Sequence, residues 1–123
     1  MIQAYSINVD SQAGAAVPFN NIVVDKGAAE CIPTPSTITL NRCGVYKVEV
    51  TGNAATAGTI QLYVDGVAQP QAISTGTTVE LNTLIQSNRN NNNCCCSKPV
   101  TVQVITPAEL TLTMINIIVT KLC

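Results

Sequence analysis

Six cysteines carry the most reactive side chains of this 123-residue chain, and their spacing decides which chemistry they can support. The chain contains no Cys-x-x-Cys pair and no histidine. A tetrahedral zinc site normally uses such pairs or histidines, and a cysteine nucleophile needs a neighbouring base, usually histidine. The sequence therefore predicts neither a metal site nor a catalytic thiol.

Three of the cysteines are consecutive, in the polar low-complexity run NRNNNNCCCSK over residues 88–98, which predicts a loop between two strands. Adjacent cysteines are poorly spaced for an unstrained disulfide with each other, and a chain terminus is usually exposed. We expect four cysteines to form outward-facing disulfides between loop and terminus, within or between subunits: Cys94, Cys95, Cys96 and Cys123. For Cys31 and Cys43 two alternatives stand: they form such disulfides, or they are buried as small reduced thiols.

The seven carboxylates are scattered, mostly in predicted turns or on the polar side of predicted strands, where the ordinary role of such a side chain is solvation. They do not form the paired arrangement of a hydrolase site. Asp25 and Asp65 do not belong to a loop with the ligand spacing of an EF-hand. We predict that the chain is not an enzyme and binds no cofactor and no metal ion.

The elements that would position these side chains are strands, because apolar residues alternate with polar ones and β-branched residues dominate. Tyr5, Ile7 and Val9 alternate with polar residues in the first segment, and Asp65-Gly66 between two alternating segments predicts a two-residue hairpin. About eight strands at regular spacing, with almost no helix, predict an antiparallel jelly-roll sandwich. The length predicts a single domain over residues 1–123.

Composition indicates what such a domain contacts. Apolar residues make up 46% of the chain and charged residues 11%, about half the usual charged share. Six basic residues occur singly, and the aromatic residues are one Phe and three Tyr, so nucleic acid is not an expected partner. No stretch reaches the ~18 apolar residues that a membrane span needs. We expect instead that protein partners cover part of the surface.

The segment over residues 109–122 is apolar on both faces, which suits a strand in the middle of a sheet that is covered on each side. The core would cover one face of this strand, and a neighbouring subunit could cover the other. We predict a homotrimer, since one core cannot bury all of this apolar surface. Its interface is predicted on six residues: Tyr46, Val48, Val50, Ile115, Ile117 and Val119.

Four segments carry a resemblance to a known family: VPFNN (17–21), STITLNRCGVYKVEV (36–50), IQLYVDGVAQP (60–70) and INIIVTKLC (115–123). Their order resembles the C-terminal trimeric domain of BclA-type exosporium glycoproteins, which implies a tumour necrosis factor-like jelly roll. The cysteine triplet and the terminal Lys-Leu-Cys are also similar to small cysteine-rich structural proteins of phages and prophages of Firmicutes. That similarity implies a place in the virion, such as decoration of the capsid.

Three functions follow as hypotheses. The first is a trimeric phage head decoration protein on the virion, seated at local three-fold positions and bound to the major capsid protein. The second is a subunit of a bacterial spore exosporium or appendage, located on the spore surface and crosslinked by disulfides. The third is a glycan- or receptor-binding module of a fibre, since jelly rolls host lectins, although the chain has few aromatic residues for stacking on sugars.

Overall fold

The computed structural model describes residues 2–25, 31–34, 37–40, 44–87 and 100–122. Within these ranges the chain forms strands and no helix, and every strand pair is antiparallel. The strands are β1 (Ile2–Ser11), β2 (Ala15–Ala16), β3 (Asn21–Asp25), β4 (Cys31–Thr34), β5 (Thr37–Leu40), β6 (Gly44–Val64), β7 (Val67–Ser87), β8 (Val100–Thr106) and β9 (Leu110–Lys121). The predicted all-β antiparallel class is confirmed.

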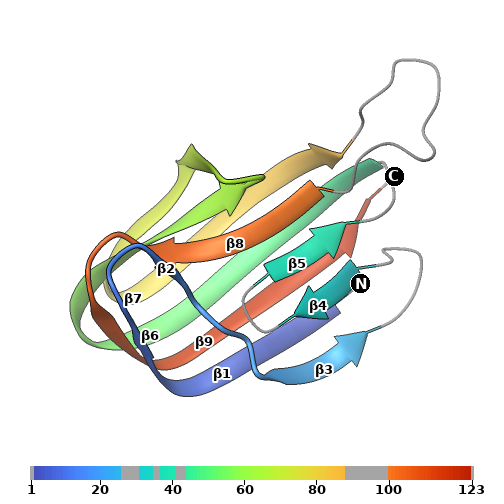
Figure 1. Cartoon of the computed structure of the whole chain (residues 1–123). Helices are drawn as coiled ribbons and strands as arrows, with labels where there is room; N and C mark the ends of the chain where they lie inside the picture. Colours follow the sequence, from blue (N-terminus) through green and yellow to red (C-terminus); the bar gives the residue numbers. More distant parts are fainter. Residues whose placement is uncertain (1, 26–30, 35–36, 41–43, 88–99, 123) are drawn as a thin grey trace.

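Two layers face each other across the core, and the long strands β6 and β7 contribute to both of them (Figure 1). The first part of β6 pairs with β9, and its second part pairs with β8. One layer, here the β9 layer, contains β3, β1, β9, the start of β6 and the end of β7. The other, the β8 layer, contains β4, β5, β8, the end of β6 and the start of β7, with β2 on β8.

The long strands bend where they pass from one layer to the other. The pairing of β6 with β7 shifts between Asn53 and Gly58, in a stretch of small residues. A Cβ atom on Gly58 would collide with the side chain of Leu110. Leu110 therefore packs against the bend, and glycine gives it the room to do so.

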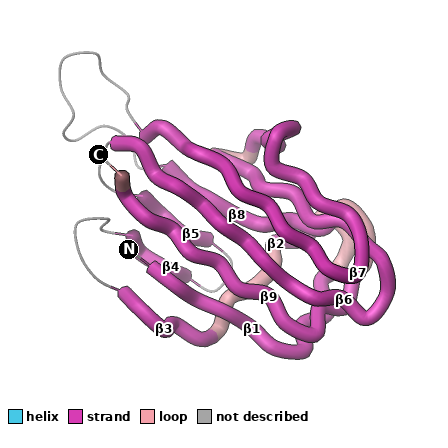
Figure 2. Tube along the Cα trace, turned by 180° about the vertical axis from the view of Figure 1, so that it is seen from behind, coloured by secondary structure: helices cyan, strands magenta, loops and turns pink. Residues whose placement is uncertain are grey.

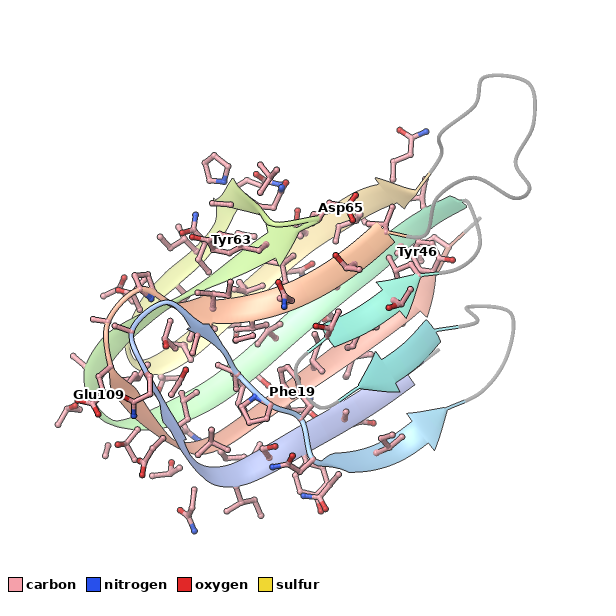
Figure 3. The ribbon with its side chains drawn as sticks, viewed as in Figure 1. Phe19, Tyr46, Tyr63, Asp65 and Glu109 are labelled. Atoms are coloured by element: carbon pink, nitrogen blue, oxygen red, sulfur yellow. The ribbon has the colours of Figure 1, made fainter. Side chains whose placement is uncertain are left out.

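The core is aliphatic and lies between the layers. In β8 the buried positions alternate strictly, with Val100, Val102 and Val104 pointing inward. The segment between β1 and β3 closes one open side of the sandwich. It crosses to β8, where the Val17 amide donates to the Val104 carbonyl at 2.7 Å, and it buries Phe19 (Figure 3).

The first strand corrects one expectation from the sequence. Ala4 and Ser6 point into the core, while Ile7 is 58% exposed, so the predicted apolar face is wrong at its start. The reason is Asn8, whose φ of 55° lies in the left-handed region. Ile7 and Asn8 consequently both face outward, and Val9 returns to the core. An alternation of inward and outward residues read from the sequence does not predict two consecutive outward residues.

Candidate interaction surfaces

The six residues predicted for the trimer interface are core residues of a single chain. Each is at most 1% exposed, and they lie between the two layers. The interface prediction is therefore wrong for these side chains, because the second layer of the same chain needs this apolar face. The structure does bring them together, in register on β6 and β9: Tyr46, Val48, Val50, Ile115, Ile117 and Val119.

The opposite side of the same strands is the outer face of the β9 layer, which Figure 2 shows from behind. Ile7 of β1 lies directly opposite Met114 of β9, and the two are 58% and 40% exposed. Ile118 lies four residues further along β9, on the same outer face, and is half-buried. Leu84, on the edge strand β7, is 59% exposed. Aliphatic side chains are thus spread over three of the strands that make up this face.

Two pairs of polar side chains lie on this face. The Lys47 ammonium lies 3.9 Å from the Glu49 carboxylate, and the Gln3 amide donates to Asn116 Oδ1 at 3.2 Å. An ion pair that is complete within one chain avoids the large cost of burying a lone charge when a partner covers the face. The carboxylates of Asp10 and Glu80 are further charges on these strands, opposite Thr111 and Thr51. The aliphatic part of this face is therefore the part that a protein partner would cover.

The outer face of the β8 layer has different chemistry. Its half-buried side chains are mostly hydroxyls and amides, with one aromatic ring, that of Tyr63. Thr59 and Thr75 share a hydrogen bond of 2.8 Å between their hydroxyls, and the Gln103 amide donates to Thr37 Oγ1 at 3.1 Å. This face is suited to polar, uncharged contacts.

The predicted Asp65-Gly66 hairpin is confirmed, and Asp65 also ties it to β8. The φ angles of Asp65 and Gly66 are 51° and 79°, as a type I′ turn requires. The Asp65 amide donates to the Thr101 carbonyl at 2.9 Å, and Asp65 Oδ1 accepts from the Thr101 amide at 2.9 Å and from its hydroxyl at 3.3 Å. Oδ1 is thus engaged within the fold, and the described residues contain no group of three or more metal-ligating side chains.

The four cysteines predicted to crosslink, Cys94 to Cys96 and Cys123, lie outside the described residues, and their disulfides stay a prediction. The described residues that flank them meet at one end of the sandwich (Figure 1). Ser87 pairs with Gly44, and the Leu122 amide donates to the Val45 carbonyl at 2.7 Å. Val100 pairs with Leu40 at this end. In the described part of the chain, no helix has the length and apolarity to cross a membrane.

No protein-family model matches the chain, and no curated protein matches it. Among solved structures, the globular domain of zebrafish complement 1qA is similar with a TM-score of 0.74 and 12% identity, over 99% of this chain and 96% of that one. Murine APRIL is similar with a TM-score of 0.61 and 13% identity, over 98% of each chain. These likenesses show the fold, and they confirm the predicted tumour necrosis factor-like jelly roll.

Proposed function

We propose that the chain is a non-catalytic structural subunit that forms a homotrimer through the outer face of its β9 layer, and that the trimer decorates a phage capsid. The observation that carries this proposal is the exposed pair Ile7 and Met114, in the middle of a layer rather than at a loop tip. Contiguous exposed aliphatic side chains on a sheet mark a surface that another protein covers. The side chains on both outer faces are mainly aliphatic, hydroxyl and amide groups, which fits a structural role better than acid–base catalysis.

The size of this face fits a subunit contact. Four strands about 4.8 Å apart, with four outward residues each at a spacing of about 6.8 Å, present roughly 500 Å² in projection. A stable interface buries about 800 Å² per partner. The face supplies more than half of that area, and the neighbouring edge of β7 is available for the remainder. Burial of the exposed parts of Ile7, Met114 and Leu84 would contribute about 1 to 2 kcal/mol for each side chain.

The position of Leu84 favours a ring over a two-fold dimer. Leu84 stands on the edge strand β7, across the layer from Ile7 and Met114. Packing of Leu84 from one copy on Ile7 and Met114 of the next joins two different patches, and such head-to-tail contacts form a ring when the rotation between copies closes. The resemblance to the trimeric BclA-type domain favours three copies in the ring.

The capsid is the proposed location, with the major capsid protein as partner. Mass spectrometry of purified virions, combined with cryo-electron microscopy of the capsid, tests it. We expect the chain in the particle, with trimeric density on the outer surface at local three-fold positions. A particle preparation that lacks the chain, or that holds it inside the head, would refute this location.

The second candidate, a crosslinked spore-surface subunit, is favoured by the shared end of the sandwich at which Ser87, Val100 and Leu122 lie. Cys123 follows Leu122 in the sequence, and Cys94 to Cys96 lie between Ser87 and Val100, so these cysteines would be suited to link neighbouring trimers. Under this proposal, non-reducing gels of mature spores or particles show dimer and trimer bands that collapse on adding reductant. Monomer bands alone, with four free thiols per chain at Cys94, Cys95, Cys96 and Cys123 by alkylation, would exclude crosslinking.

A further inference from the structure

Tyr63 has an unusual setting on the outer face of the β8 layer. It lies directly opposite Gln103 of β8 on one side and Ala68 of β7 on the other. Tyr63 is half-buried on β6, next to the fully buried Leu62, and Figure 3 labels it beside the Asp65 turn. Because Ala68 is small, its own side chain does not cover the flank of Tyr63 towards β7. The aromatic ring is therefore within reach of a ligand.

Two amides near Tyr63 are each held in place by one hydrogen bond. Gln103 Nε2 donates to Thr37 Oγ1 at 3.1 Å, and Gln61 Nε2 donates to the Gln69 carbonyl at 3.3 Å. These bonds use the donor ends and leave the Oε1 atoms as acceptors. Among the described residues, no protein group bonds either oxygen or the Tyr63 hydroxyl. Two amides with acceptor oxygens thus lie on the same face of the layer as the Tyr63 ring and its hydroxyl.

The charge of this face restricts the kind of ligand. Among the residues that the structure describes, the outward ones around Tyr63 include no acid and no base: Thr37, Thr39, Thr59, Gln61, Ile73, Thr101, Gln103 and Ile105. Asp65 stands at the margin, where its Oδ1 holds Thr101. A phosphate or an acidic chain would find no cation among these described residues, and burial of an unpaired charge is costly. The aliphatic members of this face are Ile105 and Ile73, and Ile73 lies opposite Gln61 and is 49% exposed.

We propose that this face binds a neutral saccharide, with the Tyr63 ring as a platform and the Gln61 and Gln103 amides as hydrogen-bond partners. A sugar ring offers C–H groups on one face and hydroxyl donors around its edge, which match the aromatic ring and the amide oxygens. The row from Thr37 through Gln103 and Tyr63 to Ala68 crosses four strands, about 14 Å. An oligosaccharide lying along this row contacts the hydroxyls of β5 as well.

The test is an NMR titration of the full ¹⁵N-labelled chain with maltohexaose, cellohexaose and chitohexaose, and with oligogalacturonate as an acidic probe. We expect saturable shifts of the Gln61 and Gln103 side-chain amides with at least one neutral probe. Tyr63→Ala should weaken that binding at least tenfold, because the platform is lost. Tyr63→Phe keeps the ring and should weaken it less. Thr75→Ala, two rows away on the same layer, is the matched control and should bind as the unchanged chain does.

Three results would overturn the saccharide site. They are the absence of saturable shifts with all three neutral probes, shifts that persist undiminished in Tyr63→Ala, and binding of oligogalacturonate alone. Light scattering and thermal melting of each sample separate this result from the proposed assembly. A Tyr63→Ala chain that keeps its mass and stability but loses the saccharide supports the site, whatever the number of subunits is.

Discussion

Replacement of Ser6 by alanine should destabilise the fold through two lost hydrogen bonds at a buried position. Ser6 is 1% exposed, and its hydroxyl donates to the Pro18 carbonyl at 2.7 Å and accepts from the Asn20 amide at 2.8 Å. The hydroxyl thereby ties β1 to the segment that crosses to β8. Each such bond contributes about 0.5 to 1.5 kcal/mol net, so the loss should be about 2 kcal/mol.

The corresponding change in melting temperature follows from the size of the chain. Unfolding entropy of about 2.1 cal/mol/K per residue amounts to roughly 0.26 kcal/mol/K for this length. A loss of about 2 kcal/mol then lowers the Tm by about 8 °C. Differential scanning calorimetry at one fixed protein concentration measures this shift, since assembly makes the Tm depend on concentration.

Ser74→Ala is the matched control, because the Ser74 hydroxyl also accepts a backbone amide, that of Glu80 at 3.0 Å, but at an exposed site. Water can replace the hydroxyl there, so the expected loss is below about 0.5 kcal/mol, or about 2 °C. Hydrogen exchange at the Asn20 amide should accelerate in Ser6→Ala alone. Equal shifts for the two variants, with the Asn20 amide still protected, would refute the assignment of the buried bonds.

Substitutions at two further positions test the contacts of β6 and of the turn that follows it. Gly52→Ala should lower the free energy of unfolding, measured in urea, by about 1 to 3 kcal/mol. The added Cβ would lie 2.8 Å from the Met114 carbonyl oxygen, a backbone atom that cannot easily move. An unchanged urea midpoint would contradict this close approach. In the same assay, Asp65→Ala should lower the free energy of unfolding by about 1 to 2 kcal/mol more than Asp65→Asn does. The reason is that asparagine keeps an acceptor for Thr101 and tolerates the positive φ. Equal losses for these two variants would show that neither the acceptor nor the turn conformation stabilises the hairpin.

Local chemistry made part of this fold predictable from the sequence. The Asp65-Gly66 hairpin follows from a turn that needs two residues with positive φ. Strict alternation places Tyr46, Val48 and Val50 on one face of a strand, but it does not tell whether that face meets the core or another subunit. The continuity of β6 does not follow from the sequence, because the small residues around 54–58 are typical of a break between strands, whereas the structure uses them as a bend packed against Leu110.

The interface was harder to predict, for a physical reason. The apolar residues of β9 lie on both faces of the strand, and the sequence does not state which face the second layer covers. The structure assigns Ile115, Ile117 and Val119 to the core and leaves Ile118 and Met114 on the outer side. The phase change at Asn8 likewise moves Ile7 to the surface, next to Met114. The exposed pair therefore emerges only from the three-dimensional pairing of β1 with β9.

The molecular mass in solution tests the proposed trimer most directly. The measurement compares the unchanged chain with two variants that carry an isoleucine-to-glutamate substitution, one on each layer. Ile7 and Ile73 are 58% and 49% exposed, on the β9 layer and the β8 layer respectively. At micromolar concentration, light scattering of the unchanged chain should give 3 × 12.9 kDa, or 38.7 kDa. Ile7→Glu should reduce this to 12.9 kDa, because it would bury an unpaired charge in the contact, whereas Ile73→Glu should remain trimeric. A monomeric unchanged chain, or an Ile7→Glu variant that still assembles, would contradict the account.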